Sequence, residues 1–157
     1  MSELAAALAK QFRRHADELP GADRLRIVNL RRAAFDQFEE IGIPTLRHED
    51  WKYTDIRVLR ETDYVALGQA SDAGSGDVEL SKLPFPEFTR HVAVFLDGQY
   101  CPRRSSLDGL PKEVSHSTIG GLLEQGSNDI IECLRSHETA FPSLNSAFLK
   151  DGLFIEL

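Results

Sequence analysis

The first 41 residues have the hydrophobic periodicity of two amphipathic helices, each with a single apolar face. The first predicted helix covers residues 3–19, where Leu4, Leu8 and Phe12 recur at steps of four. Pro20-Gly21 follows and stops it, because proline and glycine both disfavour continuation of a helix. One apolar face on a short helix must be covered by another part of the chain.

The second predicted helix runs from Asp23, which we expect to be its N-cap, to Ile41. Gly42 and Pro44 then terminate it. Its apolar stripe cannot be buried by the helix itself, so the two helices are expected to pack as a helical hairpin or against later segments. The stripe consists of Ile27, Leu30, Ala34, Phe38 and Ile41.

The residues after these helices fall into two segments of different composition. Residues 45–60 fit both a strand and a helical period, and we interpret them as a loop that enters a short helix. Residues 68–79, GQASDAGSGDVE, contain little that could be buried and are typical of a mobile linker. The predicted domains are therefore a helical region at 1–67, a linker region at 68–91 and an α+β region at 92–157.

The C-terminal region combines a hairpin, short helices and a final strand. Asp97-Gly98 lies between residues 92–96 and 99–103, which predicts a β-hairpin with two antiparallel strands. After a turn at Asp151-Gly152, the last residues, LFIEL, have the composition of a strand, and nothing follows it in the sequence to pair with it. The fold class is therefore α+β. Three short helices are predicted between these elements, at residues 118–125, 128–135 and 142–149.

Composition excludes several classes of protein. With 157 residues, 41% of them hydrophobic and 27% charged, the chain is predicted to be a soluble globular protein. A formal charge of -7 argues against nucleic-acid binding, which depends on basic side chains that neutralise phosphates. No stretch is long and apolar enough for a membrane span, and no signal peptide is evident. Cys101 and Cys133 lack CxxC spacing and are interpreted as reduced thiols, so a cytoplasmic location is expected.

The known catalytic and metal-binding motifs are incomplete in this sequence. His48-Glu49 and His137-Glu138 each begin an HExxH zinc motif, but neither has the second histidine. Gly74-Ser-Gly76 lacks the third glycine of a phosphate-binding loop, and the linker interpretation accounts for it better. We therefore predict no catalytic residue, no metal ligand and no cofactor bound by this chain alone.

The stretch RHEDWKYTDI, residues 47–56, contains the only tryptophan, Trp51, within a run of charged residues. Trp51 and Tyr53 can each bury a large ring while offering one polar atom to a partner, and Arg47 or Lys52 can lie over a ring face. These properties suit either a packed corner or a docking surface. From the residues alone, we favour structural anchoring of the turn by Trp51 and Tyr53, with docking as the open alternative.

Residues 38–59, FEEIGIPTLRHEDWKYTDIRVL, resemble the N-terminal region of SufD, where a helix ends in Gly-x-Pro-Thr and leads into Glu-x-Trp-Lys-Tyr-Thr. Two later segments are also similar to that family: the hairpin VFLDGQYCPRRSSL and residues 141–155, FPSLNSAFLKDGLFI. The resemblance covers nearly the whole chain from about residue 22. The matching positions, with a structural or docking role, are Gly42, Pro44, Thr45, Glu49, Trp51, Lys52, Tyr53 and Thr54.

The resemblance implies a non-catalytic scaffold component of the SUF system, which assembles iron–sulfur clusters. It implies SufB-like and SufC-like partners, where SufC is an ABC-type ATPase, so that the cluster and ATP enter only through the assembled complex. SufD-like proteins continue into a right-handed parallel β-helix, and the strand at LFIEL would begin it. On this expectation the chain is truncated, and the family's cluster-assembly residues lie beyond Leu157.

A second hypothesis belongs to a different class of function. In it, the chain is an independent protein-interaction adaptor that docks an unrelated partner through its amphipathic helices and the Trp51 region. The two hypotheses differ in the partner that should bind.

Overall fold

The computed structural model of the protein describes residues 3–60, 91–96, 98–134 and 139–157. The predicted linker at 68–79 and Asp97 of the Asp-Gly turn lie outside the described residues. The chain forms two compact units, one made of Met1–Leu67 with Leu123–Leu149 and the other of Gly68–Leu122 with Lys150–Leu157. Within the described residues, no helix is long and apolar enough to cross a membrane.

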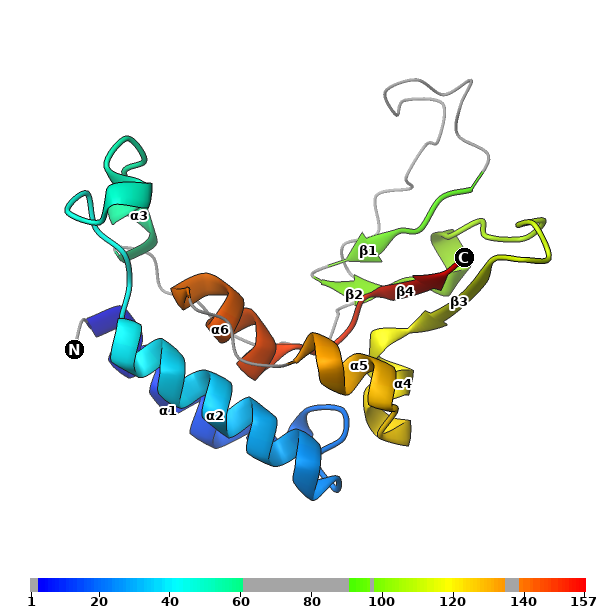
Figure 1. Ribbon diagram of the computed structural model, residues 1–157, viewed down its shortest axis with the longest axis horizontal. Coiled ribbons are helices and arrows are strands. Elements are labelled where there is room, and N and C mark those ends of the chain that lie inside the picture. Colours follow the sequence, from blue (N-terminus) through cyan, green and yellow to red (C-terminus); the bar gives the residue numbers. More distant parts are fainter. Residues whose placement is uncertain (1–2, 61–90, 97, 135–138) are drawn as a thin grey trace. The chain divides into compact units, whose positions relative to one another are not determined.

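The first unit begins with α1 (Glu3–His15), the 3-10 turn η1 (Ala16–Glu18) and α2 (Leu25–Ile41), as the hydrophobic periodicity predicts (Figure 1). The expected N-cap at Asp23 is wrong, because α2 is capped by Arg24 without a side-chain hydrogen bond. The Arg24 amide donates to Gly21 O, so a turn occupies the position where the helix was expected to start. Gly42 ends α2 as predicted, with φ of 72° and its amide bonded to Phe38 O.

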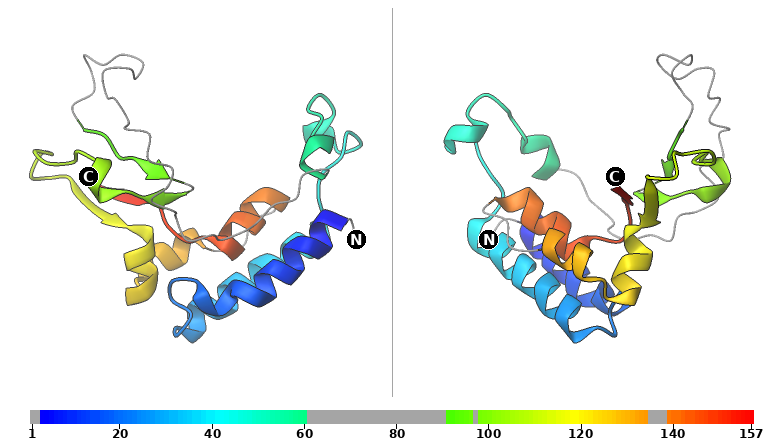
Figure 2. Two further views of the ribbon diagram at one scale, coloured as in Figure 1. Left: turned by 180° about the vertical axis from the view of Figure 1, so that it is seen from behind. Right: turned by 45° about the vertical axis from the view of Figure 1, so that its right-hand side comes forward.

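The core of the first unit forms where α1, α2 and α6 (Ala140–Phe148) meet. Phe12 of α1 stacks on Phe35 of α2 with ring centroids 4.5 Å apart. Phe148 of α6 meets both rings edge-on, at 5.5 and 6.1 Å. The two predicted alternatives are therefore both realised, since the first two helices pack against each other and against a later helix (Figure 2).

Small side chains allow α6 to approach α2 closely. Ala140, Ser143, Ser146 and Ala147 are all buried on α6, and Ala34 is buried on α2. The hydroxyl of Ser143 donates to Thr139 O within its own helix at 2.9 Å, so burial leaves no polar atom of that side chain without a partner. This face explains why a C-terminal segment joins the N-terminal helices.

The start of α2 is held by the segment around α5 (Asn128–Cys133). Arg24 Nε donates to Glu124 O at 3.1 Å, and Arg26 Nη1 donates to Asn128 Oδ1 at 2.9 Å. Gly21 has φ of 76°, and a Cβ there would lie 2.7 Å from the carbonyl oxygen of Leu123. Both the backbone conformation and the close approach require glycine at this position.

The second unit contains two small antiparallel sheets. In the first, β1 (Phe95–Leu96) pairs with β2 (Gln99–Tyr100), which confirms the predicted hairpin with shorter strands. In the second, β3 (Ser115–Thr118) pairs with β4 (Leu153–Glu156), with Ser117 opposite Phe154. No strand was predicted at β3, because SHST is short, polar and mostly exposed.

The final strand is present as predicted. Its pairing partner is β3, a strand that precedes it in the chain. Asp151 fixes the turn before β4, because its two carboxylate oxygens accept the amides of Tyr100 and Gly120 at 2.8 and 3.1 Å. A right-handed β-helix that begins at β4 remains a prediction.

The remaining predicted helices are present as α4 (Ile119–Gln125), α5 and α6. Residues 45–60 form a loop with the 3-10 turn η2 (Glu49–Trp51) and the short helix α3 (Arg57–Arg60), as predicted. A further 3-10 turn, η5 (Pro102–Arg104), follows β2. The predicted division into consecutive regions differs from the compact units, since residues 123–149 join the N-terminal helices instead of the C-terminal region. The physical reason is the buried small-residue face of α6 described above.

Candidate functional site

The predicted site residues lie in the segment that connects α2 with α3, residues 42–57, which we call the motif segment. Its first turn is closed by local hydrogen bonds between Thr45 and His48. The Thr45 amide donates to His48 Nδ1 at 3.0 Å, and the His48 amide donates to Thr45 O at 2.9 Å. Pro44 is buried at the base of this turn. The histidine that begins the incomplete zinc motif therefore closes a turn.

Trp51 joins the motif segment to the helical core. The 3-10 turn η2 places its ring beside Phe141 of α6, with centroids 5.3 Å apart and planes inclined at 59°. Trp51 is half-buried, and the Thr54 amide donates to Trp51 O at 3.0 Å. Tilted aromatic pairs of this kind contribute beyond their buried area. The contact with Phe141 agrees with the predicted anchoring role of Trp51.

Tyr53 does not share that role. Its side chain is 90% exposed, so it buries little area, and the expectation that it anchors the turn is wrong. Lys52 Nζ lies 5.0 Å from the centroid of the Tyr53 ring and also pairs with the Glu49 carboxylate. Exposed ion pairs contribute little to stability. Glu49, Lys52 and Tyr53 therefore form a solvent-facing group of two charges and one aromatic ring.

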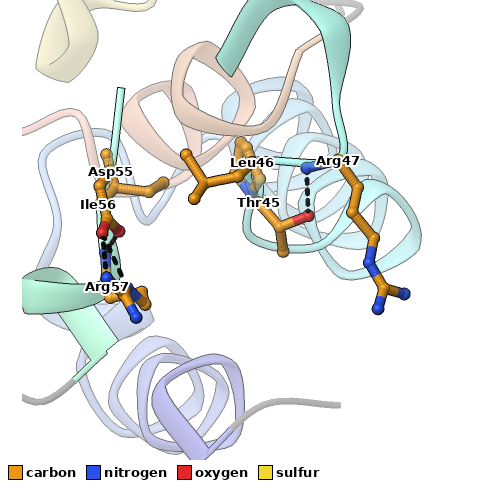
Figure 3. Close-up of a pocket in the computed structure, with 7 residues that line it drawn as sticks. Thr45, Leu46, Arg47, Asp55, Ile56 and Arg57 are labelled. Atoms are coloured by element: carbon orange, nitrogen blue, oxygen red, sulfur yellow. Dashed lines mark hydrogen bonds and ion pairs between the residues drawn. The ribbon is translucent and has the colours of Figure 1, made fainter. Parts of the chain in front are cut away.

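An open cavity of about 370 Å³ lies within the motif segment. Figure 3 shows hydrogen bonds between residues that line the cavity. Arg47 N donates to Thr45 Oγ1 at 3.3 Å, and Arg57 Nε donates to Asp55 Oδ2 at 2.8 Å. The Arg47 side chain extends away from the Asp55–Arg57 pair in that view. The cavity is lined by Pro44, Thr45, Leu46, Arg47, Asp55, Ile56 and Arg57.

The lining of the cavity combines apolar and charged side chains. Its apolar surface comes from Pro44, Leu46 and Ile56, and Leu46 is 47% exposed. The carboxylate of Asp55 pairs with the guanidinium of Arg57. An apolar side chain of a partner, flanked by a polar group, would suit this lining.

Metal-binding groups do not gather in the part of the chain that the structure describes, where no cluster of three or more His, Cys, Asp or Glu residues could hold an ion. Cys101 is a free, half-buried thiol in the second unit. His137-Glu138, the second incomplete zinc motif, lies outside the described residues. The expectation of no bound metal or cofactor stays a prediction.

Two features of the first unit were missed by sequence reasoning. Phe141 was not predicted as the partner of Trp51, although both lie in segments that resemble the same family. The burial of Arg31 on α2 was also missed, since arginine is rarely buried without a carboxylate partner. Neither feature follows from spacing along the chain, because Trp51 contacts Phe141 and Arg31 contacts Ala147, and both partners are distant in sequence.

Comparison with known proteins gives a match over almost the entire chain. The sequence profile of the "SufBD protein N-terminal region" family matches residues 2–157. An iron–sulfur cluster assembly SufBD family protein from Synechocystis sp. (strain ATCC 27184 / PCC 6803 / Kazusa) is 27% identical over 140 residues. This alignment covers 86% of the chain and 30% of the relative, so the chain spans less than a third of that protein's length. No solved structure matches the chain.

Proposed function

The chain belongs to the SufBD family, whose N-terminal region it matches, and from this premise we propose that it acts in iron–sulfur cluster assembly. The family match over residues 2–157 is the observation that carries the proposal. The name of the Synechocystis relative, an iron–sulfur cluster assembly protein, supports it. The proposed role is that of a non-catalytic scaffold component located in the cytoplasm.

Within the family, the proposal is for a SufD-like protein. Its basis is the run from Gly42 to Thr54, which has the Gly-x-Pro-Thr and Glu-x-Trp-Lys-Tyr-Thr pattern that resembles SufD. The partners in this proposal are a SufB-like protein and a SufC-like ATPase. ATP hydrolysis then belongs to the SufC-like partner, and the cluster is a product of the complex and not a resident cofactor of this chain.

The motif segment supplies the proposed contact with a partner subunit. Tyr53 is exposed beside Lys52, while Trp51 holds the same segment against α6. Tyrosine is enriched at protein interfaces because its ring is large and rigid and carries a polar end. In this proposal, Trp51 is the structural residue and Tyr53 is the docking residue.

One of the two docking surfaces in the adaptor hypothesis, the apolar faces of the first two helices, is buried in the structure. The hypothesis required these faces to be available for a partner, but Phe12, Phe35 and Phe38 are buried in the core of the first unit. The Trp51 region is the remaining surface, and it serves the proposed assembly role equally well. An unrelated partner is therefore left without a specific observation in its favour.

A binding experiment with purified proteins tests the partners. The tagged chain is mixed with SufB-like and SufC-like proteins of the same organism and analysed by size-exclusion chromatography with light scattering. We expect a complex with at least one of the two, weakened by Tyr53→Ala. A variant of another exposed side chain, Leu25→Ala on α2, should bind normally. Separate elution of all three proteins would refute the proposed partners.

A reconstitution experiment tests the absence of a resident cluster. The chain is incubated anaerobically with iron and sulfide, desalted, and examined by visible absorbance. We expect no stable cluster signal from the chain alone. A stable signal that disappears when Cys101 and Cys133 are replaced would contradict a purely scaffolding role.

A further inference from the structure

Arg31 is a buried cation without a carboxylate partner among the described residues. Its side chain lies in α2 and is only 3% exposed. Nη1 donates to Ala147 O at 3.1 Å and Nη2 donates to Pro20 O at 3.0 Å, while Nε is buried with no hydrogen-bond partner. Two neutral carbonyls satisfy part of the guanidinium but do not neutralise its charge.

The surroundings of Arg31 also affect its protonation. Burial lowers the pKa of the guanidinium from its ordinary value to about 10, because desolvation disfavours the charged form. At neutral pH the group still carries its proton. A positive charge is thus held inside the first unit, where its solvation by water has been lost.

A cavity of about 200 Å³ adjoins this residue, between the end of α1 and the first half of α2. Phe12, Ala16 and Val28 give it an apolar surface, and the charged residues around it are three arginines and one aspartate. The complete lining is Phe12, Arg13, Ala16, Asp17, Val28, Arg31 and Arg32.

The charge of this lining is unbalanced. Arg13, Arg31 and Arg32 contribute three positive charges against the single carboxylate of Asp17, which leaves a formal excess of two. Arg13 and Arg32 are exposed, and in the described ranges neither side chain makes a hydrogen bond or an ion pair. Their guanidinium groups, which bind carboxylates through paired hydrogen bonds, are therefore available to a ligand.

We propose that this cavity is a binding site for a small organic carboxylate, held by Arg13 and Arg32 at the rim with its apolar part against Phe12 and Val28. The anion would offset the excess positive charge that Arg31 helps to create. An apolar lining favours a carboxylate that carries a short hydrocarbon body over inorganic phosphate, which presents oxygen on every side. The site lies in α1 and α2, apart from the motif segment, and does not depend on the proposed function.

Nuclear magnetic resonance titration of the full chain tests this site, with sodium butyrate as the probe and sodium chloride at equal ionic strength as the reference. We expect saturable shifts of amide signals near Arg13 and Arg32 with butyrate and not with chloride. Sodium phosphate is titrated separately. Saturable binding of phosphate without binding of butyrate would overturn the assignment of the ligand class.

Matched variants separate a specific site from general attraction to a basic surface. Arg13→Gln with Arg32→Gln should weaken butyrate binding at least about tenfold, because each removed contact is a charge-assisted hydrogen bond. Arg14→Gln removes one positive charge, half the change in the double variant, from an exposed neighbour that does not line the cavity, and should leave the affinity unchanged. Equal loss in both variants, or no saturable response in the wild type, would overturn the proposal.

Discussion

The α2–α6 core and the motif segment belong to one compact unit, but different contacts hold them. In the core, Phe38 and Ala147 are fully buried and the helices meet through small side chains. The motif segment relies on local hydrogen bonds and on one aromatic contact between Trp51 and Phe141. The core therefore supplies most of the folding free energy, and the motif segment presents exposed side chains on that stable base.

The largest loss of stability is expected when a large side chain is removed from the core. Phe38→Ala removes a ring that is 0% exposed, and it should lower the free energy of unfolding by about 3–5 kcal/mol. Urea denaturation of wild type and variant measures this difference. Leu25→Ala, on the same helix at a position that is 74% exposed, is the control and should change stability by less than about 0.5 kcal/mol. Similar losses in both variants would contradict the placement of the core.

Overpacking of the α2–α6 contact should have the next largest effect. Ser143→Leu inserts a large side chain at a position with 0% exposure, where the helices are close, and should cost about 1–3 kcal/mol of unfolding free energy. Thermal unfolding by circular dichroism provides the measurement. Asn145→Leu places the same side chain on the exposed face of α6 and should be tolerated. If Ser143→Leu were neutral, the close approach of the two helices would be wrong.

The anchoring of the motif segment should be weaker than the core. Trp51→Ala and Phe141→Ala each remove one ring of the pair, and a double-mutant cycle should give a coupling of about 0.5–1.5 kcal/mol in unfolding free energy. Chemical denaturation of the two single variants and the double variant yields this value. Additive effects, with no coupling, would show that the two rings do not stabilise each other.

The smallest effect on stability is expected at Tyr53. Because its ring is 90% exposed, Tyr53→Ala should change the free energy of unfolding by less than about 0.5 kcal/mol. Its effect should instead appear in partner binding, measured by calorimetry with the SufB-like and SufC-like proteins. A large loss of stability would return Tyr53 to the anchoring role that was first predicted for it.

Local patterns in the sequence predicted the elements better than their assembly. The steps of four from Leu4 to Phe12, and the glycine at position 42, gave α1 and the end of α2 because periodicity and caps act over a few residues. The strand at residues 115–118 carried no such signal, since its side chains are polar and its stability comes from pairing with β4. Strand pairing of this kind cannot be predicted from the spacing of hydrophobic residues within the strand.

The candidate site shows the same division. The Trp-Lys-Tyr-Thr run was identified from its unusual composition, and its family resemblance was specific. The separate roles of Trp51 and Tyr53 could not be predicted, because they depend on Phe141 of a helix far along the chain. The burial of Arg31 could not be predicted either, because its guanidinium donates to the carbonyls of Pro20 and Ala147 in two other segments.

The role in iron–sulfur cluster assembly can be tested most directly in cells. The gene for the chain is deleted, and the specific activity of an iron–sulfur dehydratase is measured relative to the amount of its polypeptide. Our account predicts that activity falls while the polypeptide level stays constant, and that the wild-type gene restores activity whereas Phe38→Ala restores it poorly. Unchanged dehydratase activity in the deletion strain would contradict the proposed function.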